Sequence, residues 1–288
     1  MQKKIAEIMR SKGHHWVGDA FPVRSLFSYN GDAQAISPFL LFDYAGPHEF
    51  APREQPRGVG QHPHRGFETV TIVYEGEVSH SDSTGGGGTI GPGDVQWMTA
   101  GGGIIHEEYH SPDFSRSGGP FRMVQLWVNL PARDKMVAPG YQPIVDADIP
   151  VVELADGAGK ARIIAGEFAG VNGPAHTYSP VNLWDVRLKA GAKATLDLPE
   201  GHTVMIAVLG GAVSLGGQNV GEAEIVRLER SGSTVEVRAE AHSILLVMTG
   251  EPLDEPVFGH GPFVMTSEAE IREAIDDFNS GRFGKVAA

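Results

Sequence analysis

Four residues with metal-binding side chains lie in two pairs that are about forty residues apart in the sequence. The first pair is His62 and His64, and the second is His106 and Glu108. Side chains at positions i and i+2 of a β-strand lie on the same face. Imidazole and carboxylate groups suit Fe, Zn, Ni or Mn, and a thiolate site is excluded because the chain has no Cys. If a barrel brings the pairs together, the sequence predicts a site with three nitrogen ligands and one oxygen ligand.

Each pair taken alone has a simpler explanation, since a His-x-His or His-x-Glu in a chain with 12 His is more often a surface or packing pair. Their joint occurrence beside Gly-rich turns favours the metal site. Gly101–Gly103 precedes His106 and permits positive φ and close backbone approach. Gly85–Gly88 lacks the Gly-Lys-Ser/Thr of a phosphate loop, so we interpret it as a hairpin turn.

Short strands are expected to position these residues. The patterns predict strands over 39–42, 67–80, 95–98 and 121–130, and a loop over 46–60 that carries a solvated His48. Gln125 would lie either near the metal or in a cross-strand hydrogen bond, and the hydrogen bond is the preferred interpretation.

The second half of the sequence repeats the strand pattern without the metal-binding pairs. Prolines and a glycine over residues 131–150 predict an extended linker, which places a domain boundary at 135/136. Strand runs separated by Gly-rich turns follow over 151–250, at the spacing of a second barrel. This half contains His176, His202 and His242 but no His-x-His or His-x-Glu, so we expect a barrel without metal.

The C-terminal end is expected to form a helix. Ser267 and Glu270 fit a capping box, and Gly281 suits the C-cap. An apolar stripe at i, i+3, i+4 and i+7 comprises Ile271, Ala274, Ile275 and Phe278. The helix should pack on a barrel without direct chemistry, and His260 should have a structural role.

Composition narrows the classes of function. The chain has 288 residues, which is room for two domains, and a net charge of −13. This charge disfavours general affinity for nucleic acid or anionic membranes. The sequence shows no targeting segment and no apolar run approaching 18 residues, so we expect a cytoplasmic protein.

Several segments resemble the pirin family of the cupin superfamily. The resemblance implies an all-β bicupin fold of two jelly-roll-like barrels, 1–135 with one mononuclear iron site and 136–288 without metal but with a short C-terminal helix. In pirins the ligands correspond to His62, His64, His106 and Glu108, and Glu107 should face the other way. The general cupin pattern would instead use Glu68, which is the second choice. The matching segments are 62–71, 90–101, 103–106, 125–131 and 260–265.

The resemblance also implies a function. Some pirins show quercetin 2,3-dioxygenase activity, so we expect an Fe(II) enzyme that acts on quercetin or a similar enol-bearing aromatic together with dioxygen. Glu108 would then be the base that removes the substrate proton. The alternative from the family is a metal-dependent regulator that binds a transcription factor or a metabolic enzyme. A sugar-phosphate isomerase ranks third, because only Arg65 and Arg122 lie near the site in sequence to bind phosphate.

Overall fold

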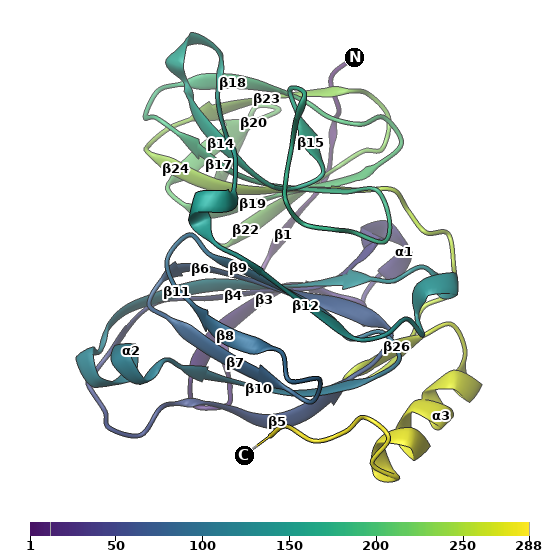
Figure 1. The fold of residues 1–288 in the computed structure, drawn as a ribbon. Coiled ribbons are helices and arrows are strands. Elements are labelled where there is room, and N and C mark those ends of the chain that lie inside the picture. Colours follow the sequence, from purple (N-terminus) through teal and green to yellow (C-terminus); the bar gives the residue numbers. More distant parts are fainter. Residues whose placement is uncertain (12, 288) are drawn as a thin grey trace. The chain divides into compact units, whose positions relative to one another are not determined.

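The chain is built mainly of β-strands with a few short helices (Figure 1). The computed structural model describes residues 1–11 and 13–287. The expected all-β class with a short C-terminal helix is therefore confirmed. No helix in the described part of the chain combines the length and the apolar sequence that a membrane crossing requires.

The elements have the following bounds in chain order. The strands up to residue 129 are β1 (Ile5–Arg10), β2 (His15–Val17), β3 (Phe21–Ser28), β4 (Phe39–Phe50), β5 (Gly58–His64), β6 (Phe67–Glu75), β7 (Val78–Asp82), β8 (Gly87–Ile90), β9 (Val95–Thr99), β10 (Ile104–His110) and β11 (Gly119–Asn129). The later strands are β12 (Gly140–Ile144), β13 (Val151–Glu153), β14 (Gly159–Ala165), β15 (Glu167–Phe168), β16 (Val171–Asn172), β17 (Val181–Leu188), β18 (Lys193–Asp197), β19 (Thr203–Gly210), β20 (Ala212–Leu215), β21 (Gln218–Gly221), β22 (Glu224–Leu228), β23 (Thr234–Ala239), β24 (Ser243–Gly250), β25 (Phe258–His260) and β26 (Phe263–Met265). The helices are α1 (Ala33–Ile36), α2 (Pro112–Ser117) and α3 (Glu268–Asn279), with 3₁₀ turns η1 (Ala132–Asp134), η2 (Asp146–Asp148) and η3 (Ala155–Gly157).

The chain divides into two compact units, and neither is contiguous in the sequence. The first barrel, as we call it, contains Gly13–Gln34, Phe39–Asp146 and the C-terminal segment from Leu253. The second barrel contains the N-terminal segment through Ser11, Ala35–Pro38 and Ala147–Pro252. This partition differs from the halves 1–135 and 136–288, because hydrogen-bonded strand partners decide which unit a segment joins. Strand β1 pairs with β22, whereas α3 contacts β25 and β26 of the first barrel.

The first barrel consists of two antiparallel sheets that face each other (Figure 1). The seven-stranded sheet has the order β12-β9-β6-β11-β4-β3-β2, and the four-stranded sheet has the order β5-β10-β7-β8. An aromatic cluster that includes Phe21, Phe50, Phe114 and Phe121 fills one part of the interior. The strands that carry the predicted ligands, β5 and β10, are neighbours in the smaller sheet.

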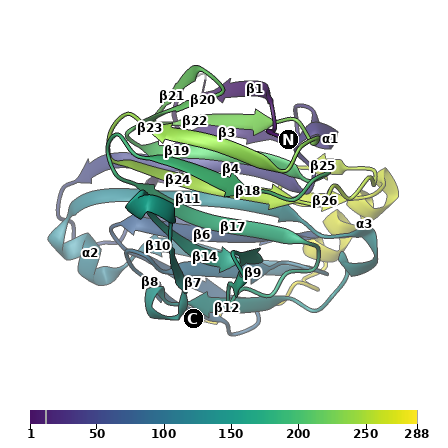
Figure 2. The ribbon, with the colours of Figure 1, turned by 90° about the horizontal axis from the view of Figure 1, so that it is seen from above.

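The second barrel has the same arrangement of a larger and a smaller sheet. Its seven-stranded sheet has the order β1-β22-β19-β24-β17-β14-β13, and Figure 2 shows several of these strands side by side. Its four-stranded sheet has the order β18-β23-β20-β21. Aliphatic side chains from both sheets and one tryptophan, Trp184, form its core.

Two segments that were predicted to be irregular are partly strands. The loop prediction for 46–60 is wrong at both ends, because β4 continues to Phe50 and β5 begins at Gly58. The register between β4 and β11 shifts near Pro47, and such bulges accommodate proline in a strand. The linker predicted over 131–150 contains β12, which pairs with β9. Strand β12 lies at the edge of its sheet, where Pro143 is tolerated because an edge strand has one unpaired side.

The N-terminal end of the C-terminal helix is as predicted, but its C-cap is Ser280 and not Gly281. Ser267 is the N-cap of α3, and its side chain accepts a hydrogen bond from the Glu270 amide. Gly281 follows the helix with a φ of 79°, in the left-handed region that glycine adopts easily. Ile271 and Ala274 are buried in a cluster with Phe263 and other apolar side chains of the first barrel. The prediction that the helix packs on a barrel is confirmed.

Candidate metal centre

Strand pairing brings His62 and His64 together with His106, whereas Glu108 groups instead with His80 and His106. Strands β5 and β10 run antiparallel, with His62 opposite His106 and His64 opposite Ile104. The ring centroid of His106 lies 4.2 Å from that of His62 and 4.9 Å from that of His64. One nitrogen from each of the three rings lies within 4.8 Å of the others. The three histidines therefore form a group that could hold one metal ion.

Each of these imidazoles has a hydrogen-bond partner at Nδ1. His62 Nδ1 lies 2.9 Å from the Gly60 carbonyl oxygen, and His64 Nδ1 lies 3.4 Å from the Pro262 carbonyl oxygen. His106 Nδ1 lies 3.3 Å from Nδ1 of His80. Within the described residues, no Nε2 of the three rings has a hydrogen-bond partner, and that of His106 is buried. Partnered Nδ1 atoms and unpartnered Nε2 atoms are what a group of metal-ligating histidines requires, so the residues fit a metal ion.

Burial keeps two of these rings neutral. Burial, followed by the charge of the nearby His62, lowers the pKa of His64 to about 3. Burial, followed by the neighbouring histidines, also lowers the pKa of His106 well below its ordinary value. Because a metal ion binds only the unprotonated imidazole, these pKa shifts favour binding across the neutral range.

Glu108 lies on the same face of β10 as His106 and forms a second group with His80 and His106. Its Oε1 accepts a hydrogen bond of 3.0 Å from Nε2 of Gln96, and the hydroxyl of Thr71 lies 3.4 Å from the same oxygen. No hydrogen bond to Oε2 is found among the described residues. One carboxylate oxygen is thus held by the protein, and the other is available.

The remaining predicted positions are distributed as strand alternation requires. Glu107 lies on the opposite face of β10 from His106 and Glu108, as expected. Glu68 lies outside both candidate metal groups. Alternation along β6 places it on the opposite face from Thr71, whose hydroxyl lies near Glu108. Glu68 instead accepts a hydrogen bond of 2.7 Å from Thr99 Oγ1. Gln125 has both predicted features, since it accepts a hydrogen bond of 2.6 Å from Thr71 Oγ1 across the strands and lines the pocket beside the histidines.

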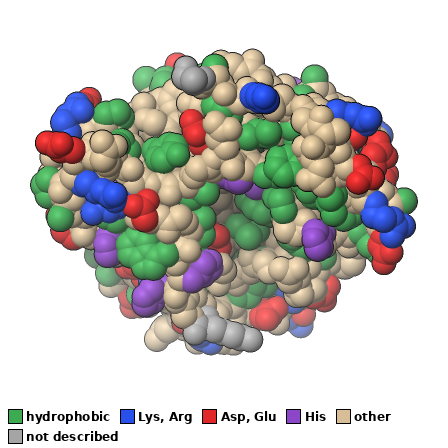
Figure 3. Space-filling view, turned by 90° about the horizontal axis from the view of Figure 1, so that it is seen from below, with side chains coloured by type: hydrophobic (Ala, Val, Ile, Leu, Met, Phe, Trp, Pro, Cys, Tyr) green, Lys and Arg blue, Asp and Glu red, His purple; other side chains and the backbone are tan. Residues whose placement is uncertain are grey.

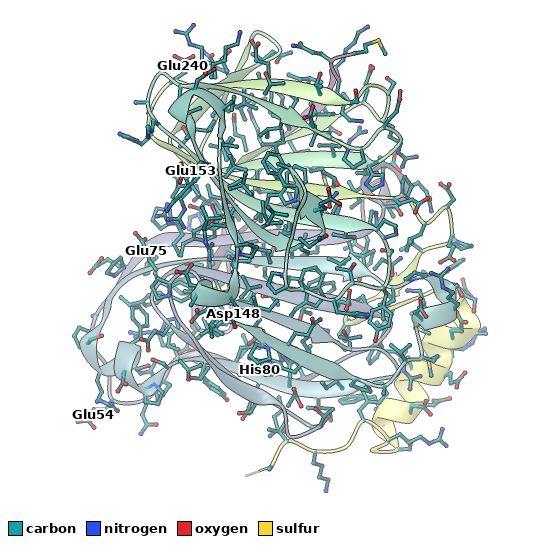
Figure 4. All side chains as sticks on the ribbon, turned by 45° about the horizontal axis from the view of Figure 1, so that its top comes forward. Glu54, Glu75, His80, Asp148, Glu153 and Glu240 are labelled. Atoms are coloured by element: carbon teal, nitrogen blue, oxygen red, sulfur yellow. The ribbon has the colours of Figure 1, made fainter. Side chains whose placement is uncertain are left out.

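His80 and its partners are the residues near this centre that sequence reasoning missed. Figure 4 labels His80, whose ring lies among the strands, in contrast to the peripheral Glu54. His80 Nε2 lies 3.0 Å from Oδ2 of Asp82. His80 and Asp82 are themselves an i, i+2 pair on β7, so the spacing that identified His62 and His64 could have found them.

The C-terminal segment supports the turn that follows His64. Arg65 donates a hydrogen bond of 2.7 Å from Nε to the Gly102 carbonyl oxygen, and its guanidinium forms a buried ion pair of 2.7 Å with Asp277 of α3. Gly66 has a φ of 88°, and a Cβ there would lie 2.1 Å from the Val264 carbonyl oxygen, so only glycine fits. Together with the Pro262 carbonyl at His64, these contacts give the end of the chain a role in orienting a candidate ligand.

A pocket of about 350 Å³ opens beside the histidines. His62, His64 and Glu108 lie in its wall, and the other lining residues are mainly apolar or aromatic: Val17, Phe21, Val23, Leu41, Asp43, Val59, Met123, Gln125 and Trp127. In the space-filling view of Figure 3, hydrophobic and histidine side chains gather around a hollow in the face shown. A small, largely apolar molecule with a few polar groups could contact the candidate metal ligands from this pocket.

Two barrels with a His/Glu group inside the first define a bicupin with a candidate metal centre. Residues 20–128 match the Pirin family model, and residues 183–284 match the model of the Pirin C-terminal cupin domain. The chain belongs to the pirin family.

Relatives and solved structures extend this similarity over the whole chain. A Pseudomonas aeruginosa protein named "Putative quercetin 2,3-dioxygenase" is 60% identical over 281 residues, which cover 98% of each chain. Human pirin is 40% identical over 255 residues, covering 86% of this chain and 83% of that one. The crystal structure of quercetin 2,3-dioxygenase from Acinetobacter baumannii superposes with a TM-score of 0.97 at 52% identity and covers 100% of both chains.

Proposed function

We propose that the chain is a metal-dependent dioxygenase that cleaves quercetin or a similar enol-bearing aromatic. We further propose that His62, His64, His106 and Glu108 hold the metal ion, which is Fe(II). The observation that carries the proposal is the group of three histidines with partnered Nδ1 atoms and unpartnered Nε2 atoms, two of which, His62 and His64, line a largely apolar pocket. Relatives with whole-chain similarity carry the name of this activity, which supports the choice of substrate class.

The pocket suits a flat aromatic substrate with polar substituents. Its volume of about 350 Å³ lies within the range of small-molecule pockets. Trp127 and Phe21 offer aromatic surface and exclude water from the reacting atoms. The amide nitrogen of Gln125 has no protein acceptor among the described residues, so it can donate a hydrogen bond to a substrate oxygen.

Glu108 is the proposed base. Oε2 is the oxygen without a protein donor, so it can either ligate the metal ion or take the proton of an enolic hydroxyl group, while the hydrogen bond from Gln96 holds Oε1 and keeps the carboxylate in place. A bound Fe(II) ion would supply a Lewis acid for the substrate oxygen and a redox centre for dioxygen. The protein's own contribution is to orient the substrate, remove its proton and exclude water.

The test is dioxygen uptake with quercetin after anaerobic loading of the protein with Fe(II). The loaded protein should consume dioxygen, and Glu108→Gln should lower the rate by about 100-fold or more, because general-base catalysis contributes on that order. Glu107→Gln is the matched control, since this neighbour faces the other side of β10 and should leave the rate unchanged. Metal binding without any quercetin-dependent uptake would refute the proposed activity. Turnover by the apo-protein would refute its dependence on metal.

A further inference from the structure

His80 lies beside the candidate ligands, is buried, and has a defined partner on every side. Its Nε2 lies 3.0 Å from Oδ2 of Asp82, and its Nδ1 lies 3.3 Å from Nδ1 of His106. The ring of Tyr141 stacks on it, with centroids 4.9 Å apart and an interplanar angle of 16°. The exposed fraction of the His80 residue is 3%, so the ring has little freedom to turn.

The hydrogen bonds determine which ring nitrogen of His80, and which of His106, carries a proton. Oδ1 of Asp82 accepts hydrogen bonds from the backbone amides of Thr84 and Gly86, and Oδ2 lies 3.0 Å from Nε2 of His80, a set of contacts that suits an ionised carboxylate. A carboxylate only accepts, so Nε2 of His80 carries the proton and Nδ1 of a neutral His80 is an acceptor. His106 must then donate from Nδ1, which leaves its Nε2 as a lone pair.

Gln96 supports the same assignment independently. Its Oε1 accepts a hydrogen bond of 3.3 Å from the Tyr141 hydroxyl, which fixes the orientation of the amide. Burial, followed by Glu108 and Asp82, raises the pKa of Tyr141 to about 12, so this hydroxyl keeps its proton. The amide nitrogen of Gln96 donates to Glu108 and lies 3.4 Å from Nδ1 of His80, an approach that suits an unprotonated Nδ1.

The Gly-rich turn after β7 holds Asp82 in place. Oδ1 of Asp82 accepts hydrogen bonds from the Thr84 amide at 2.8 Å, the Thr84 hydroxyl at 2.6 Å and the Gly86 amide at 3.1 Å. A Cβ at Gly86 would lie 2.6 Å from Oδ2 of Asp82, the oxygen that faces His80. The run Gly85–Gly88 therefore has a structural role that the sequence did not predict. It lets the backbone pack closely around the Asp82 carboxylate.

We infer that Asp82 and His80 are positioning residues, which orient His106 and hold it in the tautomer whose Nε2 faces the metal site. The inference rests on the proposed metal centre, but it concerns the hydrogen bonds behind the ligand rather than the substrate or the reaction. The series of hydrogen bonds runs from the Gly-rich turn through Asp82 and His80 to His106. Hydrogen-bonded partners of this kind behind a ligating histidine typically change metal affinity by about 10- to 100-fold.

The first measurement is the affinity of the apo-protein for Zn²⁺, determined by competition with a chelator. Asp82→Asn should weaken binding by about 10- to 100-fold. The Asn amide can donate to Nε2 of His80, which moves the proton of His80 to its Nδ1. That N–H would then face the Nδ1–H of His106, which could no longer donate to His80. His80→Leu should weaken binding to a similar extent. His80→Gln should restore most of the affinity, since its amide can donate to Asp82 and its carbonyl oxygen can accept from His106. Ser81→Ala is the matched control, because this exposed neighbour points away from the site.

The second measurement is the tautomer of His106, read from long-range ¹H–¹⁵N NMR spectra of the apo-protein. The wild-type protein should show a proton on Nδ1 of His106, and Asp82→Asn should reduce the population of that form. Unchanged tautomer and affinity in both Asp82→Asn and His80→Leu would overturn the inference. Loss of all binding in both His80→Leu and His80→Gln would also overturn it, since His80 would then be a ligand in the group with His106 and Glu108. Neither measurement requires quercetin turnover, so failure of the proposed activity can be distinguished from failure of this inference.

Discussion

The two barrels share one strand order but have different interiors. In each, a seven-stranded sheet faces a four-stranded one, and β5-β10-β7-β8 of the first barrel corresponds in order to β18-β23-β20-β21 of the second. In the first barrel, these strands direct His64, His80, His106 and Glu108 into the interior. In the second, the buried positions on the corresponding strands are Ala194, Leu196, Val213, Leu215, Val220, Val235, Val237 and Ala239.

This difference separates the requirements of the fold from those of the site. The four-stranded sheet of the second barrel buries aliphatic side chains at alternate positions, and these stabilise the barrel by removing apolar surface from water. The first barrel has polar groups at the corresponding places, and each buried one needs a partner, because an unpaired polar group in the interior costs about 1–3 kcal/mol. The network of Gln96, Thr71, His80 and Asp82 supplies such partners around the histidines and Glu108. The same topology can therefore hold either a packed core or a candidate metal centre.

The largest effect on stability should come from the apolar barrel. Leu196→Ala should lower the free energy of unfolding by about 4 kcal/mol, because the side chain is buried and its removal leaves a cavity. The exposed neighbour Thr195 provides the control, and Thr195→Ala should change stability by less than about 0.5 kcal/mol. Denaturant unfolding measures both variants. Metal content per folded protein should stay at the wild-type level, and a decrease in it would break the comparison between the barrels.

A somewhat smaller loss should follow when the C-terminal helix is detached from the first barrel. Asp277→Ala leaves the buried guanidinium of Arg65 without its partner and should cost about 3 kcal/mol. It should also weaken metal binding, because Arg65 follows His64 directly in the chain. Asp276→Ala, at an exposed position of the same helix, should do neither. Thermal unfolding and metal titration are the measurements, and an unchanged affinity for metal would show that the helix only stabilises the fold.

The smallest effect should be a change in how stability depends on pH. The described buried glutamates both lie in the first barrel, and burial raises the pKa of Glu68 from 4.5 to about 7, despite the hydrogen bond from Thr99. The folded state therefore binds a proton more tightly than the unfolded state, so this group's contribution to stability is lost as pH rises from about 4.5 through about 7. Glu68→Gln should remove that loss and stabilise the protein by about 2 kcal/mol above pH 7, relative to wild type. Unfolding curves measured across this range should diverge, and parallel pH profiles of the two proteins would contradict the assignment.

Much of the architecture could be predicted because it depends on local patterns. The alternation in β6 and β11 and the cap at Ser267 are readable from neighbouring residues. The observed division into two non-contiguous units could not be predicted in this way. The pairing of β1 with β22 and the docking of α3 on the first barrel join segments that are far apart in the chain, and no local pattern encodes them.

For the candidate site, the sequence by itself determined which side chains share a face, because period-two alternation fixes His62 with His64 and His106 with Glu108. Only the tertiary structure decided which faces meet. The register of β5 against β10 set His62 opposite His106, and β7 brought His80 and Asp82 behind them. The physical reason is that a strand's alternation is a property of its own backbone. Its partners are instead chosen by the burial and hydrogen bonding of the whole barrel.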